Sequence, residues 1–277
     1  MAPGPYQPLA ARCRMNENYD LEGRVHKLEQ RRPITSGLES LPDHDSFDVE
    51  FSPSGQAIHF TQYTFAGQVF RSETYNYDDL GRLVRTLEFD GADTEASKTD
   101  YECDSGGKRV GWTRRDKSGA VTVRSAQEYL GRLVASLVSF RANGLVMRRK
   151  TFDYSEDKLA QSVSTYYNPT GDVTEQCISR YNAEERIAET FGLRSDGKPL
   201  GDGRYEYEYD LEGRESRVLS FNDSADGNEP NHIKHFAYKF DKHGNWIERC
   251  EYSRFTRDSD WQKSVTTRKL IYYLPRT

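Results

Sequence analysis

The sequence predicts an all-β protein, a long antiparallel meander of about 18 strands forming a curled or spiral sheet. Three observations predict it. A short phrase recurs about every 28 residues along the chain. A second Gly-containing turn signal falls midway between copies, which leaves two segments of roughly 8–10 residues per unit, the length of a strand. These segments alternate as strands do: residues 204–209 place Tyr on one face and Glu on the other.

The recurring phrase reads as a hairpin turn. Its clearest copies are YDLEGR at 19–24, YDDLGR at 77–82, YDLEGR at 209–214 and FDKHGN at 240–245, and weaker ones lie at 51–56, 103–108, 128–132, 154–158 and 181–186. The Asp or Asn can accept hydrogen bonds from backbone N–H groups, and the Gly three residues later supplies a positive φ. We therefore expect type I turns closed by a left-handed residue. Lys158 and Glu185 replace this Gly and should carry left-handed strain.

Two columns of side chains accompany the turns. The aromatic column holds Tyr19, Phe51, Tyr77, Cys103, Gln127 or Tyr129, Tyr154, Tyr181, Tyr209 and Phe240. Neighbours in it should stack across every second strand, each pair adding roughly 0.2–1 kcal/mol. The basic column holds Arg24, Arg82, Lys108, Arg132, Arg186 and Arg214. A phosphate-binding stripe is one interpretation of the basic column, and exposed ion pairs with the turn Asp, worth under about 1 kcal/mol each, are the simpler one.

The repeated Tyr-Asp-x-x-Gly-Arg phrase resembles the YD repeats of the RHS and teneurin-like proteins, over residues 19 to about 273. The resemblance implies β-hairpin sheets that spiral into a shell, which in large members encloses a toxin. This chain departs from the family in its longer period, its lack of toxin cargo and the absence of a self-cleavage motif after the last repeat. The resemblance therefore implies a small bacterial YD-repeat protein without cargo.

The repeat also divides the chain. We expect a disordered N-terminal segment at 1–18, a YD-repeat sheet domain of about nine units at 19–273, and a tail at 274–277. Residues 25–50 should form a loop, and the strand 265–273 an exposed edge protected by Arg268, Lys269 and Pro275. No secretory signal and no long apolar run occur, which predicts a cytoplasmic protein unless a leader was removed.

No catalytic residue is predicted. Glu206, Glu208, Asp210 and Glu212 could supply an acid/base pair, but a solvated strand face is the simpler interpretation. Neither a GxSxG nor a phosphate-loop motif is present. The Gly-rich run 105–108 coincides with a repeat turn, whose chemistry explains it. The sequence therefore predicts that the protein is not an enzyme.

Metal and cofactor sites are not predicted either. The histidines are His26, His44, His59, His232, His235 and His243. Only His232 and His235 form a near pair, and on a strand that spacing points them to opposite faces. His243 should face solvent within its turn. The cysteines at 13, 103, 177 and 250 lack CxxC spacing, which favours reduced thiols, and Arg12 beside Cys13 disfavours lipidation.

Two function classes remain. The first is a non-catalytic structural or protein-interaction repeat module with an unidentified protein partner. The second is a carbohydrate or cell-wall binder that stacks sugars on Trp112, Tyr166, Trp246 or Trp261. A chain so poor in aliphatic residues needs its aromatics for its own core, which favours the first class. The formal net charge of −5 argues against nucleic-acid binding, and we expect no membrane insertion. No particular ligand-binding residue follows from the sequence.

Overall fold

The computed structural model describes residues 25–31, 42–221, 229–255 and 260–272, and all its regular elements are β-strands. The strands are β1 (Val25–Arg31), β2 (Pro42–Phe51), β3 (Ala57–Thr64), β4 (Val69–Tyr77), β5 (Leu83–Asp90), β6 (Glu95–Cys103), β7 (Arg109–Asp116), β8 (Val121–Leu130), β9 (Leu133–Arg141), β10 (Val146–Ser155), β11 (Lys158–Tyr167), β12 (Val173–Tyr181), β13 (Ile187–Arg194), β14 (Pro199–Tyr209), β15 (Glu215–Phe221), β16 (His232–Phe240), β17 (Trp246–Arg254) and β18 (Gln262–Tyr272).

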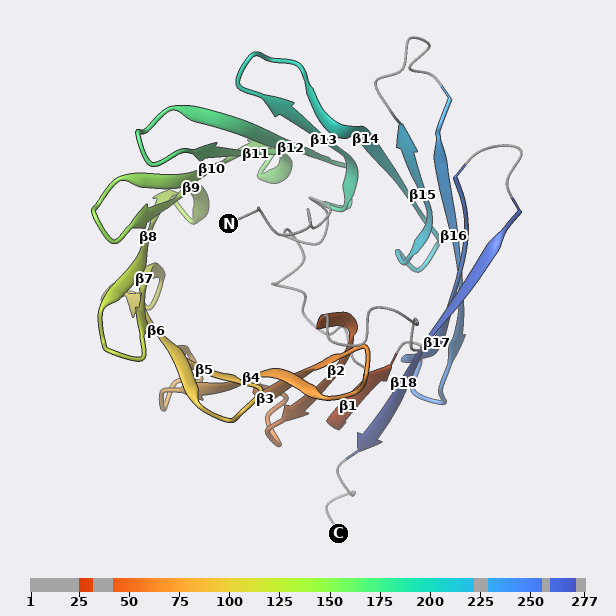
Figure 1. Ribbon diagram of the computed structural model, residues 1–277, viewed down its shortest axis with the longest axis horizontal. Helices are drawn as coiled ribbons and strands as arrows, with labels where there is room; N and C mark the ends of the chain where they lie inside the picture. Colours follow the sequence, from red (N-terminus) through yellow and green to blue (C-terminus); the bar gives the residue numbers. More distant parts are fainter. Residues whose placement is uncertain (1–24, 32–41, 222–228, 256–259, 273–277) are drawn as a thin grey trace.

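The strands form one closed antiparallel barrel, which Figure 1 shows as a ring (Figure 1). Each strand pairs with the next in the chain, and β1 pairs with both β2 and β18. The closing register sets Glu29 opposite Lys269 on one side and opposite Asp48 on the other. At about 4.8 Å per strand, a ring of 18 strands is at least about 27 Å across between opposite backbones.

Closure corrects three sequence predictions. The all-β meander is confirmed, but the curled or spiral sheet is wrong, because the first described strand meets the last. The loop expected at 25–50 is wrong, since β1 and most of β2 lie there. The exposed edge expected at 265–273 is wrong as well, because β18 is paired on both sides. Strand twist and coiling that accumulate over 18 strands can bring two edges together, and pairing them removes both exposed ladders. Residues 1–18 and 274–277 lie outside the described residues, and the domain boundary at 19–273 stays a prediction.

The hairpin turns have the predicted chemistry. At the β4–β5 turn the Gly81 N–H donates to the Asp78 carbonyl at 2.9 Å, and Gly81 has a φ of 75°. Asp78 Oδ1 accepts from the backbone N–H groups of Leu80 and Arg82 at 3.0 and 2.8 Å. Glu185 has the expected left-handed φ of 59°. The expectation for Lys158 is wrong, because a two-residue turn at 156–157 takes the positive φ angles and β11 begins at Lys158.

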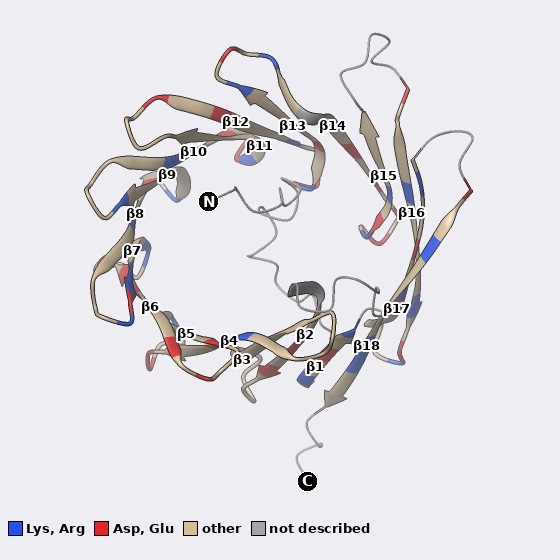
Figure 2. Cartoon of the chain, in the orientation of Figure 1, with Lys and Arg blue, Asp and Glu red and all other residues tan. Residues whose placement is uncertain are grey.

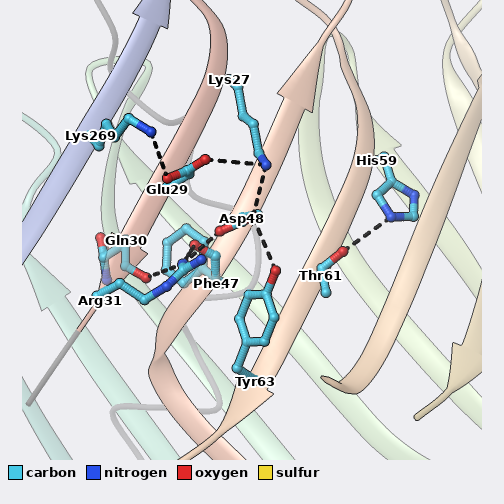
Figure 3. Close-up of polar contacts among 10 residues, drawn as sticks. All are labelled: Lys27, Glu29, Gln30, Arg31, Phe47, Asp48, His59, Thr61, Tyr63 and Lys269. Carbon is cyan, nitrogen blue, oxygen red and sulfur yellow. Dashed lines mark hydrogen bonds and ion pairs between the residues drawn. The ribbon is translucent and has the colours of Figure 1, made fainter. Parts of the chain in front are cut away.

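The two faces of the wall can be assigned to the inside and the outside. Strand alternation and register place Val49 and Ser162 on one face, and Asp48 and Ala126 on the other. Ser162 is only 2% exposed, whereas the similarly small Ala126 is exposed. Side chains crowd together on the concave side of a barrel. In addition, the Asp48 side chain stands in front of its strand in Figure 3, with the opposite wall behind. We call the Val49 side the inner face and the Asp48 side the outer face.

The apolar core is small and lies at one place on the ring. Val25, Leu28, Val49 and Phe51 are buried together, with Leu28 and Val49 at 0% exposure. Phe47, Ala57, Phe60, Leu270 and Tyr272 pack against them. These residues belong to β18, β1, β2 and β3, which we call the closing seam. Elsewhere the buried positions are mostly Ser and Thr, so the ladder and its cross-strand pairs hold the wall together.

Candidate functional site

A polar network crosses the outer face of the closing seam (Figure 3). Asp48 on β2 is 8% exposed and accepts a hydrogen bond from Arg31 Nη1 at 2.6 Å. Its second oxygen lies 3.0 Å from Lys27 Nζ and accepts from the Tyr63 hydroxyl at 3.1 Å. Because a buried carboxylate is stable only when its lone pairs are satisfied, this network belongs to the architecture of the seam. It joins β1, β2 and β3 through one side chain.

The predicted acid/base candidates are engaged in ion pairs. Glu206 lies 3.1 Å from Arg204, and Glu208 lies 3.2 Å from Arg217, both on the outer face. The other two carboxylates share one guanidinium, with Arg214 at 2.6 Å from Asp210 and 2.5 Å from Glu212. None of these contacts brings two of the four carboxylates across from each other as glycoside hydrolysis requires.

His232 and His235 lie apart. His232 stacks on Phe255 with a ring separation of 4.2 Å, on the inner face, and His235 lies on the outer face, 5.3 Å from Trp261. The predicted opposite orientation is therefore confirmed. His243 is exposed in its turn, as expected. His44 is outside the residues whose side chains are described. Within the described part of the chain, no three His, Cys, Asp or Glu side chains gather as metal ligands. Its three cysteines, Cys103, Cys177 and Cys250, are free thiols.

The aromatic column has a function that the sequence reasoning missed. Four of its tyrosine hydroxyls donate to backbone carbonyls at or next to the start of the preceding strand. The bonds run from Tyr77 to Ala57 at 2.7 Å, Tyr129 to Arg109 at 2.8 Å, Tyr154 to Val134 at 3.0 Å and Tyr209 to Ile187 at 2.8 Å. The choice of Tyr over Phe at these positions is the signal that could have revealed the bonds.

Two members of the basic column form the predicted ion pair with the turn Asp, with Arg82 2.7 Å from Asp78 and Arg214 2.6 Å from Asp210. It also reaches the neighbouring hairpin. Lys108 lies 4.9 Å from the ring centre of Tyr129, and Arg214 lies 4.3 Å from that of Phe240. Such cation–π contacts stabilise by about 0.5–1 kcal/mol at exposed sites. These partners favour the ion-pair interpretation of this column over a phosphate-binding stripe.

Direct hydrogen bonds also connect successive hairpins. The residue after one turn donates to a carbonyl in the next turn, as Gln56 does to Gly81 at 2.8 Å, Lys108 to Gly131 at 2.7 Å and Lys158 to Ala183 at 2.9 Å. All these turns follow even-numbered strands and therefore lie at one end of the barrel. We call this end the turn rim. The other end carries the remaining connections.

Hydrogen bonding at the turn rim shifts the pKa of its acids. The backbone N–H of Arg82, followed by its guanidinium, holds the pKa of Asp78 below its usual value. Burial alone would raise the pKa of Asp241, but hydrogen bonds from the Tyr272 hydroxyl and from the backbone N–H groups of His243 and Asn245 lower it overall. Burial and the bond to Asp241 raise the pKa of Tyr272 to about 12. The ionised turn carboxylate is thus part of the folded hairpin.

Charged residues of both signs lie all around the ring (Figure 2), and the strand register places them on both faces. Ion pairs on the inner face join Arg71 to Glu73 at 3.3 Å, Arg114 to Glu88 at 2.6 Å and Lys234 to Glu251 at 2.9 Å. Those on the outer face join Arg85 to Asp100, Arg180 to Glu189 and Lys239 to Glu248, each at 2.7 Å. A wall of this kind is polar on both faces.

The aromatics proposed as sugar platforms are mostly used within the wall. Arg268 stacks on Trp246 at 3.5 Å, and Arg148 lies 5.4 Å from the ring centre of Tyr166. Trp112 pairs in register with Tyr101. Trp261 is 43% exposed, and Arg254 lies 4.7 Å from its ring centre.

The fold defines a class, the closed antiparallel β-barrel. No family model matches the chain, and no curated protein matches it. Among solved structures it is similar to a porin-like protein from Bacteroides uniformis, with 13% identity over 91% of this chain and 98% of that one and a TM-score of 0.46. A porin-like protein from Bacteroides vulgatus has 10% identity over 90% and 98% of the chains and a TM-score of 0.41. A third match, the TcdB2-TccC3-Cdc42 structure, has 10% identity over 85% of this chain but 16% of that one, with a TM-score of 0.25. Identities and TM-scores this low transfer no function.

These findings correct the predicted identity. The assignment to the RHS/YD-repeat family is wrong, because the ring is closed where a spiral shell is open. The predicted functions, a structural or protein-interaction repeat module or a carbohydrate binder, assumed that open repeat sheet and are wrong as well. The predictions of no membrane insertion and of a cytoplasmic location are corrected as well, because a closed antiparallel barrel is one of the two architectures that can span a membrane. Within the described residues, no helix is long and apolar enough to cross a membrane. That the protein is not an enzyme stays a prediction.

Proposed function

We propose that this chain is a non-catalytic, channel-like β-barrel whose wall surrounds a passage for water and small polar solutes. The observation that carries the proposal is the closure of an 18-stranded ladder between β1 and β18. A barrel of about this strand number is wide enough to leave an aqueous interior, whereas an eight-stranded barrel is filled by its own side chains.

The inner face supports the same function. Besides the ion pairs of Arg71, Arg114 and Lys234, it carries the small, buried side chains of Ser162, Ser164 and Ser179 along β11 and β12. Charged groups keep water in contact with the wall, and small side chains leave room for it. A polar solute would meet hydrogen-bonding partners along this surface.

The charge of the outer face determines the energetic cost of contact with lipid. Membrane-spanning barrels carry an apolar outer band, and a Lys or Arg facing the bilayer midplane costs about 2–4 kcal/mol. The outer face here carries Lys27, Arg85, Arg180 and Arg217, each in an ion pair. Because contact between these charges and lipid would be costly, conduction has to be measured on barrels whose ring is shown to be intact.

The test is electrical. Purified barrels, checked for ring shape by electron microscopy and for β-structure by circular dichroism, are added to a planar lipid bilayer. We expect stepwise conductance increases of uniform size, and none from the same protein unfolded in urea or from a Leu28→Asp variant with a disrupted seam. Intact rings that produce no conductance steps at any voltage or protein concentration would overturn the proposal.

A further inference from the structure

Charge is distributed unevenly along the inner face. Among the strand residues that the structure describes in β8–β12, this face carries three cations, Arg141, Arg148 and Lys150, and one carboxylate, Glu175. Arg148 and Lys150 lie two residues apart on β10, and Arg141 lies on the adjacent β9. We call these three residues the cationic strip.

The two arginines of the strip are held by neutral groups. Arg148 Nη2 donates to the Ser164 hydroxyl at 3.0 Å, and Arg141 Nη2 donates to the Tyr167 carbonyl at 2.5 Å. The Nε atom of each guanidinium is buried and has no hydrogen-bond acceptor. Among the described residues neither arginine forms an ion pair with a carboxylate. Each therefore carries a charge that no described carboxylate neutralises.

Three other inner-face cations differ from the two arginines of the strip. Arg71, Arg114 and Lys234 each lie within 3.3 Å of a glutamate oxygen. Their charge is thus neutralised locally, while that of Arg141 and Arg148 extends into the space that the wall surrounds. A charged, partly desolvated wall of one sign attracts ions of the other sign.

We propose that the cationic strip binds small oxyanions, the class that includes phosphate, and makes the passage selective for anions. Guanidinium and ammonium groups form short charge-assisted hydrogen bonds with oxyanions, and the Ser139 and Ser164 hydroxyls lie on the same face in register with β10. The inference of oxyanion binding depends only on these side chains. The inference of anion selectivity also depends on the proposed channel function.

Inorganic phosphate titrated into the intact barrel, followed by calorimetry, tests the binding. We expect the double variant Arg148→Gln, Lys150→Gln to weaken phosphate binding about tenfold, because two charge-assisted contacts are lost. Arg149→Gln is the matched control, since Arg149 lies between these residues but on the exposed outer face, and it should bind like the wild type. Exchanging the two residues, Arg148→Lys with Lys150→Arg, keeps both charges and should retain most of the affinity. Unchanged binding in the folded double variant, or an equal loss in Arg149→Gln, would overturn the site.

A second measurement separates this inference from the proposed function. In a bilayer with a potassium chloride gradient, wild-type barrels should give a reversal potential of the sign for chloride preference, and the double variant should shift it towards zero. Conductance without anion preference would refute the selectivity and leave the channel standing. Phosphate binding without any conductance would refute the channel and leave the oxyanion site standing.

Discussion

Lys269 on β18 lies 3.4 Å from Glu29 on β1, although 240 residues separate them in the chain. The pair sits directly opposite in the register that closes the ring. On the other side of β1, Asp48 faces Glu29 and binds Lys27 and Arg31. The closing seam is thus held by a core on its inner face and a charge network on its outer face.

The charge network predicts the cost of opening the seam. Asp48→Ala leaves Lys27, Arg31 and the Tyr63 hydroxyl without their shared acceptor, and we expect a loss of about 2–3 kcal/mol in the free energy of unfolding. Lys269→Ala is the control, because its side chain is 69% exposed and the loss should stay below about 1 kcal/mol. Urea unfolding followed by circular dichroism measures both. Equal losses in the two variants would refute the importance assigned to Asp48.

Backbone conformation predicts opposite effects at two turns. Asp93 has a φ of 58°, so Asp93→Gly should stabilise the barrel by about 0.5–1 kcal/mol. Gly81 has a φ of 75°, and a Cβ there would lie 3.0 Å from the Gln56 side chain, so Gly81→Ala should destabilise it by about 1 kcal/mol. Thermal unfolding midpoints should move in opposite directions. A fall in both midpoints would show that the Asp93 side chain contributes more than its strain costs.

The hydroxyl bonds of the aromatic column predict a small, specific effect. Tyr209→Phe keeps the ring and removes the bond to the Ile187 carbonyl, which should cost about 0.5–1.5 kcal/mol. Tyr252→Phe serves as control because Tyr252 is 37% exposed, and its contact with Lys263 is made by the ring. Denaturant midpoints compare the two. Identical midpoints would mean that the column acts through its rings alone.

The shifted pKa values of two carboxylates and one tyrosine at the turn rim predict that the barrel loses stability at both low and high pH. The folded pKa of Asp78 and of Asp241 is below the ordinary value of 3.8, so their contribution is present above that value and is lost as the pH falls through the folded pKa. The pKa of Tyr272 is raised from 10.0 to about 12, so its contribution is complete below pH 10 and is lost as the pH rises towards 12. Unfolding curves across pH should show the alkaline loss in wild type and not in Tyr272→Phe. An alkaline loss that persists in this variant would assign it to other groups.

Local features could be derived from the sequence, and long-range ones could not. The Asp78 turn, the strand alternation and the opposite orientation of His232 and His235 follow from interactions within a few residues. The closing pairs, such as Glu29 with Lys269, depend on the twist summed over every intervening strand, which a periodic pattern does not encode. The repeat therefore suggested an open spiral. The cationic strip escaped prediction for a local reason, since a β-bulge between Val146 and Arg148 places Arg148 on the same face as Arg141.

Ring closure restricts the number of strands to even values, a restriction that an open sheet does not have. Because neighbours all around the circumference run antiparallel, the number of strands must be even. Insertion or loss of one strand would force one pair to run parallel, while a change of two would only alter the bore. The hairpin, rather than the strand, is thus the smallest step by which this barrel can widen or narrow. Its diameter takes discrete values, spaced by roughly 3 Å per hairpin.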